Sequence, residues 1–201
     1  MIRKTTKTYD DCPPMSKLPV ETILSRFVDE LLELQPTPPL IPFNHDWPSL
    51  CYLQQAENGQ LVGWRPSRQL PPSDMFTRLQ DALQEDIHPD IVSFYTSFWS
   101  DPLPAICEHG ELSLIQVWND EDMERLRSNL IGHALSKRQQ KRPLTFFFAC
   151  PEPDENYFIS LDNFSGEIWL ETPGKPPIRK LADSMSEFLQ SLSPLKVTDA
   201  E

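Results

Sequence analysis

The spacing of hydrophobic and polar positions changes in the middle of the chain. Residues 112–118, LSLIQVW, are mostly apolar and favour extended backbone, which predicts an interior strand covered on both faces. Asn119 can cap a helix, and the residues after it predict a helix from Asp120 to about Leu135. The apolar stripe of that helix comprises Met123, Leu126, Leu130, Ile131, Ala134 and Leu135. This strand and helix are expected to form the centre of the fold.

Three other patterns predict β-hairpins, because each places a turn sequence between two strand-like runs. The pairs are residues 50–54 with 60–65 around Asn58-Gly59, residues 105–107 with 111–118, and residues 157–161 with 167–171. Residues 144–150 predict one more buried strand.

Helices are predicted where the apolar period is about 3.6 residues. Such patterns begin near Pro19, Ser73, Pro89 and Ser184, and Glu187 completes a capping box with Ser184. Hairpins interleaved with helices indicate an α+β fold with a largely antiparallel sheet. We expect a single domain over residues 18–201, preceded by a loose amino-terminal arm over residues 1–17.

Composition supports a soluble protein with its own core. The chain has 201 residues, and its 21 prolines cluster between the predicted elements as stiff connections. The basic amino terminus has no apolar run behind it and therefore does not resemble a signal peptide. No apolar run approaches the ~18 residues that span a bilayer. The four scattered cysteines form no CxxC pair, which favours reduced thiols.

Charge is distributed unevenly along the chain. The formal net charge is −12, which argues against nucleic acid as a partner. Residues 79–124 contain eleven Asp or Glu and no Lys or Arg, and residues 143–174 contain six acids and again no Lys or Arg. These two segments either converge into one negative field or form an ordinary solvated acidic surface, and composition alone favours the second interpretation.

Motifs for catalysis and metal binding are absent from the sequence. There is no GxGxxG, P-loop, GxSxG or HExxH pattern, so we predict no enzyme activity, no cofactor and no metal. Carboxylates at residues 120–124 lack the spacing of a calcium loop and suit a helix start. Gly132 within the predicted helix indicates close approach of another element. Trp118, at the end of its strand, is either a core residue or an anchor for a partner.

Several segments taken together resemble the Syd family of SecY-interacting proteins, in the SUKH superfamily. They are SLCYL through GWRP (49–66), HPDIVSFYTSFWSD (88–101), GELSLIQVWNDEDMERLRSNLIGH (110–133), PLTFFFA (143–149), ISLDNFSGEIWLE (159–171) and LADSMSEFLQSLSPL (181–195). The resemblance covers nearly all of the chain after the arm. The arm and the PEPDEN loop after Cys150 depart from the pattern.

The resemblance implies a protein that docks on the cytosolic loops of the SecY translocase channel through a concave acidic surface and checks or restrains the translocase. It also implies a cytoplasmic location, peripheral on the inner membrane, with membrane contact only through SecY. From charge and predicted strand ends we place the partner-binding residues at Glu111, Trp118, Asp120, Glu121, Asp122, Glu124, Asp162 and Glu167. Two alternatives stay open: an immunity protein of the same superfamily that neutralises a basic toxin, and a hydrolase that uses the carboxylates.

Overall fold

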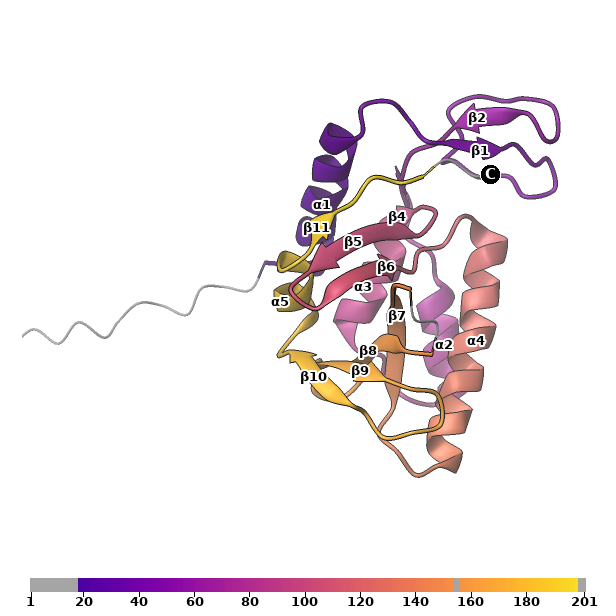
Figure 1. Ribbon diagram of the computed structural model, residues 1–201. Helices are drawn as coiled ribbons and strands as arrows, with labels where there is room; N and C mark the ends of the chain where they lie inside the picture. The colour runs from indigo at the N-terminus through magenta and orange to yellow at the C-terminus, as the bar shows by residue number, and fades with distance from the viewer. Residues whose placement is uncertain (1–17, 154–155, 199–201) are drawn as a thin grey trace, which may run out of the picture.

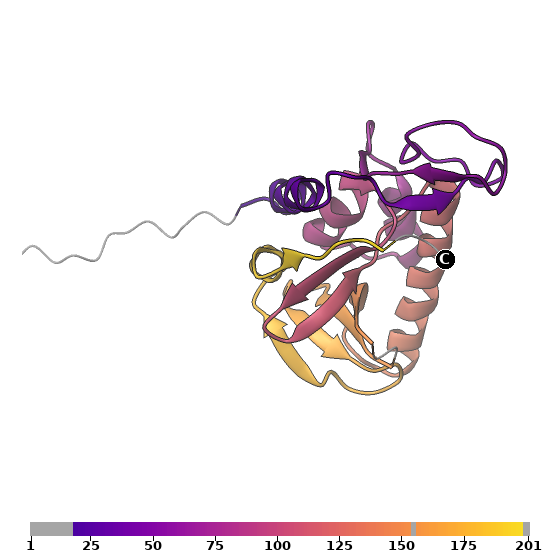
Figure 2. The ribbon, with the colours of Figure 1, turned by 45° about the horizontal axis from the view of Figure 1, so that its top comes forward.

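A seven-stranded antiparallel sheet forms the centre of the protein (Figure 1). The structure is a computed structural model that describes residues 18–153 and 156–198. In spatial order the strands are β10 (Arg179–Ala182), β9 (Ile168–Glu171), β8 (Phe158–Asp162), β7 (Thr145–Pro151), β6 (Gly110–Leu114), β5 (Leu103–Cys107) and β11 (Ser193–Pro194). Every neighbouring pair is antiparallel, and the sheet curls, as the two views in Figures 1 and 2 show. The predicted α+β architecture is confirmed.

Strand β6 is interior, as its apolar sequence predicted. It pairs with β5 on one side and β7 on the other, so both of its edges are covered. The strand ends at Leu114, earlier than predicted, although the Ile115 amide still donates to the Phe148 carbonyl at 2.8 Å. Val117 and Trp118 are buried beyond the end of the strand. The apolar pattern of residues 112–118 therefore predicted burial correctly, but it did not predict that sheet pairing stops at Leu114.

Five helices pack around the sheet in the described ranges: α1 (Val20–Leu34), α2 (Met75–Leu83), α3 (Pro89–Ser97), α4 (Asp120–Gln139) and α5 (Met185–Gln190). Phe148 of β7 contacts Phe94 of α3 and Phe188 of α5, with ring centroids 5.4 and 5.7 Å apart. Its neighbour Phe147 contacts His133 of α4 instead. Because adjacent strand residues point to opposite faces, helices approach β7 from both sides.

Helix α1, near the start of the described chain, packs against elements from its C-terminal part. It packs against α3, α5 and β11. The Gln35 side chain just after α1 donates to the Val197 carbonyl at 3.0 Å and accepts from the Val197 amide at 2.8 Å. The Ser186 hydroxyl of α5 donates to the Leu18 carbonyl at 2.9 Å. The first and last described segments are therefore tied together.

The hairpin predicted between residues 50–54 and 60–65 forms only in part. Tyr52 and Trp64 form an antiparallel bridge, and the Leu53 and Arg65 amides donate across it to Gly63 and Cys51, each at 3.0 Å. Strand β2 (Leu61–Gly63), however, pairs along its length with β1 (Leu40–Pro42) in a separate two-stranded sheet. The predicted turn at Gly59 does form, with φ of +83°. Its amide donates to the Phe43 carbonyl at 2.8 Å, so the turn serves the proline-rich segment that was assigned no strand. We call this two-stranded unit the small sheet.

Other expectations require smaller corrections. The helix predicted to begin near Ser73 runs from Met75 to Leu83 and ends where Gln84 adopts a left-handed conformation with φ of 51°. The close approach inferred at Gly132 is wrong, since a Cβ added there would meet nothing within 4 Å. Strands β10 and β11, and the short pair β3 (Ser67–Arg68) and β4 (Phe98–Trp99), were not predicted. The expected arm over residues 1–17 lies outside the described residues.

Candidate partner-binding site

The first turn of α4 carries the largest group of predicted partner-binding residues. Asn119 caps the helix, because its side chain accepts from the Asp122 amide at 2.9 Å. The Asp122 carboxylate accepts in return from the Trp118 amide at 2.9 Å, so cap and first turn hold each other in place. Asp120 and Glu121 are exposed, and neither forms an ion pair with any residue of the described ranges. The turn therefore presents two fixed negative charges to solvent.

Glu124, one turn further along α4, is already paired within the fold. Its carboxylate accepts from Arg78 of α2 at 2.5 Å and from Arg127 at 2.8 Å. Hydrogen bonds from these two guanidinium groups lower the pKa of Glu124. The residue stays ionised, but its charge is balanced locally and contributes little to a field that a partner would feel.

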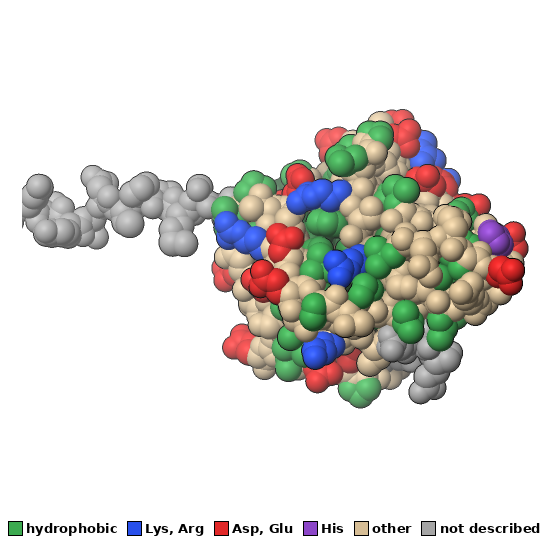
Figure 3. Space-filling view, turned by 90° about the horizontal axis from the view of Figure 1, so that it is seen from above, with side chains coloured by type: hydrophobic (Ala, Val, Ile, Leu, Met, Phe, Trp, Pro, Cys, Tyr) green, Lys and Arg blue, Asp and Glu red, His purple; other side chains and the backbone are tan. Residues whose placement is uncertain are grey.

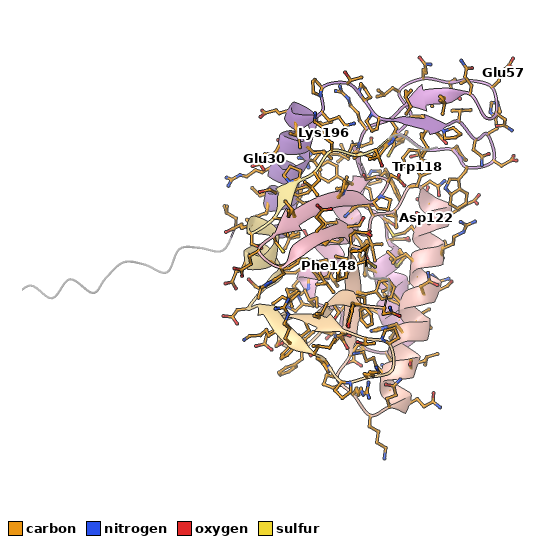
Figure 4. All side chains as sticks on the ribbon, in the orientation of Figure 1. Glu30, Glu57, Trp118, Asp122, Phe148 and Lys196 are labelled. Atoms are coloured by element: carbon orange, nitrogen blue, oxygen red, sulfur yellow. The ribbon has the colours of Figure 1, made fainter. Side chains whose placement is uncertain are left out.

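A cavity of about 560 Å³ lies beside this turn, between α4 and the small sheet. Its lining includes four aromatic residues and two carboxylates: Phe43, Trp47, Tyr52, Trp118, Asp101 and Asp122. Figure 4 shows Trp118 and Asp122 together at the start of α4 beneath the small sheet, whereas Glu57 lies on the outer loop of that sheet. Four parts of the chain thus build one concavity: the proline-rich segment, the connection from it to β2 with Tyr52 and Gly59, the β4–β5 connection and the start of α4.

The rings that line the cavity also hold one another in position. Tyr52 contacts Phe43 at a centroid separation of 4.7 Å and meets Trp118 edge to face at 5.0 Å. Trp118 contacts the buried Trp64 at 5.7 Å, and its carbonyl accepts from the Ser49 hydroxyl at 2.6 Å. Trp118 is only 5% exposed, so it is a wall of the cavity and not a projecting side chain. Its predicted role as an anchor stays a prediction, limited to the part of the ring that faces the cavity.

Asp101 is the second carboxylate of the cavity, and it was not among the predicted partner-binding residues. Burial raises the pKa of Asp101, and the nearby charge of Asp122 raises it further. No Lys, Arg or His side chain pairs with it in the part of the chain that the structure describes. Asp101 is thus a partly desolvated acid that lacks a cation.

The remaining predicted residues lie elsewhere. Glu111 lies level with the Pro151 end of β7, because the Glu152 amide donates to its carbonyl. Asp162 pairs with Thr145 at the opposite end of β7, roughly 20 Å away along the strand. Asp162 accepts three hydrogen bonds within the turn between β8 and β9, and Glu167 is paired with Lys180 at 3.0 Å.

Neither group adjoins the cavity. Asn163, next to Asp162, bonds to the Asp86 carbonyl beyond the end of α2, where Glu85 pairs with Arg138 in the last turn of α4. Helix α4 is about 30 Å long. The β8–β9 hairpin lies near its last turn and Asp120 lies in its first, so the two are far apart. The structure therefore distributes the eight predicted residues over three places: the α4 residues with Trp118, Glu111 alone, and Asp162 with Glu167 in the β8–β9 turn. Whether any of them contacts a partner stays a prediction.

Charge on the face seen from above, over α1 and the small sheet, is mixed. Acidic, basic and hydrophobic side chains alternate across it in Figure 3, with no continuous acidic field. On this face the acidic side chains are scattered among basic and hydrophobic ones, although the net charge of the chain is negative. Among the described helices, none combines the length and apolar character needed to cross a membrane. No three His, Cys, Asp or Glu side chains of residues 18–153 and 156–198 gather as a metal site would require.

Comparison with known proteins identifies the family. The family model described as "Syd protein (SUKH-2)" matches residues 18–194. A "Protein Syd" of Alteromonas mediterranea is 40% identical over 179 residues, which cover 89% of this chain and 98% of that protein. A "Protein Syd" of Hahella chejuensis is 41% identical over 78% of this chain and 82% of its own length, and one of Shewanella frigidimarina is 35% identical over 88% and 79%. The chain therefore belongs to the Syd family.

Proposed function

We propose that this chain acts by binding, not by catalysis, and that its partner is the cytosolic face of the SecY channel. The observation that supports this most directly is the acidic first turn of α4, where exposed Asp120 and Glu121 adjoin the aromatic cavity. Membership in the Syd family supports the choice of partner. The protein would be cytoplasmic and would reach the inner membrane only through SecY.

The electrostatic argument rests on complementary sign. Cytoplasmic loops of membrane proteins are enriched in Lys and Arg, so a fixed negative turn beside a concavity is a suitable receptor for such a loop. Exposed charges of this kind act mainly on the association rate, because they steer the encounter and are screened by salt. Ion pairs that become buried on binding add little net affinity, because desolvation offsets the Coulomb attraction.

The test is the association rate with SecY in nanodiscs for the variant Asp120→Asn/Glu121→Gln. We expect association to slow by about threefold to tenfold near 50 mM salt, and the difference to shrink near 500 mM, where screening is stronger. Amides preserve size and suit the helix start better than lysine would, so folding should be little affected.

Glu30→Gln/Glu33→Gln is the matched control. These acids are exposed on α1, and the substitution changes the net charge by the same amount. The control should associate like the unmodified chain. Equal slowing by both variants would show that only total charge matters, and absence of SecY binding by the unmodified chain would refute the proposal.

A further inference from the structure

The cavity between α4 and the small sheet has the composition of a receptor for a cationic side chain. Its volume of about 560 Å³ lies within the usual range of ligand sites, roughly 300 to 1,000 Å³. Aromatic rings present a negative π-face that attracts cations, and Trp does so most strongly. Trp47, Tyr52 and Trp118 all line this cavity. A cation held there would meet both aromatic rings and carboxylates.

Asp101 supplies a negative charge to the cavity, and no Lys, Arg or His of the described residues pairs with it. Its carboxylate lines the cavity beside Asp122, but Asp122 is already engaged by the Trp118 amide. Burial and the neighbouring charge both raise the pKa of Asp101, so folding has already removed part of its hydration. A bound cation would gain the Coulomb attraction without again desolvating this partner, which is the benefit of a preorganised site.

We propose that this cavity binds the guanidinium group of an arginine side chain presented by a basic segment of the partner, with Asp101 as its carboxylate and Trp47, Tyr52 and Trp118 as the surrounding rings. Arginine is favoured over lysine because a planar guanidinium stacks on aromatic rings while its N–H groups bond to a carboxylate. The inference deepens the proposed function, because the arginine would belong to the same basic partner. It assigns recognition to the cavity and steering to Asp120 and Glu121.

A guanidinium already stacks on one of these rings within the protein. The Arg125 guanidinium carbon lies 4.1 Å from the centroid of the Trp47 ring. Arg125 is an exposed residue of α4 and is not part of the cavity lining, so it leaves the cavity open. The contact shows that a guanidinium stacks on Trp47 in this fold, and it covers the ring face that Arg125 occupies.

The first experiment uses the full chain and two short peptides. Acetyl-Gly-Gly-Arg-Gly-Gly-amide is titrated against the ¹⁵N-labelled protein, and the indole N–H signals of Trp47 and Trp118 are followed by NMR. The comparison peptide carries citrulline, which has nearly the shape of arginine but no charge. We expect saturable shifts with the arginine peptide. The citrulline peptide should bind at least about tenfold more weakly, because the charge-assisted hydrogen bond is lost. Equal shifts with both peptides, or no saturable shift, would overturn the proposal.

The second experiment replaces the carboxylate. Asp101→Asn keeps the shape of the side chain and should weaken binding of the arginine peptide about tenfold. Glu57→Gln is the matched control, since it removes one charge from the exposed loop of the small sheet without touching the cavity. It should change the affinity by less than about twofold, because exposed charges at a distance are screened. Equal losses of affinity for the arginine peptide in both variants would show that it responds only to the overall negative charge, and would overturn the proposal.

The two proposals can fail separately. If SecY associates in a manner that depends on salt and on Asp120 and Glu121, but the arginine peptide leaves the indole signals unchanged, the proposed function stands and the arginine site is wrong. If the peptide binds in an Asp101-dependent way but SecY does not, the site is real and its partner is another basic protein.

Discussion

A single buried glutamate organises the polar interior of the sheet. Glu171 is fully buried, and its carboxylate accepts from the Lys137 ammonium, from Thr145 at 2.7 Å and from Ser160 at 2.5 Å. Burial raises the pKa of Glu171, but these three donors outweigh burial and lower it overall. His133 extends the network through a 3.1 Å contact between its Nε2 and the Thr145 hydroxyl. A buried ion pair of this kind tolerates the loss of both charges better than the loss of one.

Replacing Lys137 with methionine should therefore destabilise the protein by roughly 3 to 5 kcal/mol, because it leaves a buried carboxylate without its cation. The free energy of unfolding in urea measures this effect. Lys141→Met is the control on an exposed lysine just after α4 and should change stability by less than about 0.5 kcal/mol. The double variant Lys137→Met/Glu171→Gln should recover part of the loss. If the single and double variants were equally unstable, the ion pair would not be the cause.

His133 should make stability sensitive to mild acid. Burial lowers the pKa of His133 below its usual 6.5, and the nearby Lys137 charge lowers it further. The folded pKa then lies below the unfolded one, so the unfolded chain binds more protons, and the free energy of unfolding falls as the pH drops below 6.5. Glu171 acts in a lower window, since its contribution is present above 4.5 and is lost on further acidification.

His133→Gln should flatten the pH dependence of the free energy of unfolding between about pH 7.5 and 5.5 while leaving the loss in stronger acid. The glutamine amide can still bond to Thr145, so the fold should be retained. Urea titrations at several pH values provide the measurement. An unchanged slope in that range would show that another group causes the pH dependence.

At the scale of elements, two glycines differ in what surrounds them. Gly132 lies inside α4, and the place of its missing Cβ is open. Gly166 follows β8 in the turn to β9, where φ is +76° and an added Cβ would lie 2.7 Å from Nε2 of His88, the residue that caps α3.

Gly132→Ala should raise the free energy of unfolding by about 0.5 to 1 kcal/mol, because alanine restricts the unfolded chain and favours the helix. Gly166→Ala should lower it by about 1 to 2 kcal/mol or more, because an L-residue is strained at this φ. Thermal unfolding of the two variants side by side tests both signs. A loss of stability in Gly132→Ala would revive the close approach that the sequence suggested.

Sequence reasoning succeeded for elements whose signal is local. Helix α4, the cap at Ser184 and the hairpins β5–β6 and β8–β9 formed close to where they were predicted, because period, cap and turn lie within a few residues. The predicted stripe of α4 was wrong at its end, where Leu135 is 55% exposed and Lys137 is buried. It failed where pairing depends on distant chain. Strand β1 lies in a proline-rich run, and β10 begins with Arg179 and Lys180, so neither shows the alternation of a core strand.

At the scale of the whole molecule, the same reasoning explains why the site was only partly predicted. The acids of α4 were found because carboxylates at a helix start form a sequence signal. The cavity was not, because Tyr52, Asp101 and Trp118 come from separate segments that meet only in the fold. Acids distant in the chain, such as Glu111 and Asp162, were grouped by charge and predicted strand ends, but the sheet register places them at opposite ends of β7.

The small sheet should open more readily than the central sheet. A two-stranded sheet is marginal by itself, and the small sheet meets the hydrophobic core through Ile41 and through Trp64, which follows β2. Native-state hydrogen exchange should therefore show low opening free energies for the Gly59 and Gln60 amides, higher ones near Trp64, and the highest in β7. A uniform opening free energy across these amides would mean that the molecule opens as one unit.

The position of α1 has a consequence for synthesis on the ribosome. Its apolar stripe is covered by α3, α5 and β11, and about 150 residues separate the end of α1 from the start of α5. At roughly 5 to 20 residues per second, the segment that completes this cover appears about 8 to 30 s after α1 itself. During that interval the nascent chain carries an amphipathic helix with part of its hydrophobic face bare. The domain can reach its final packing only after translation has passed α5.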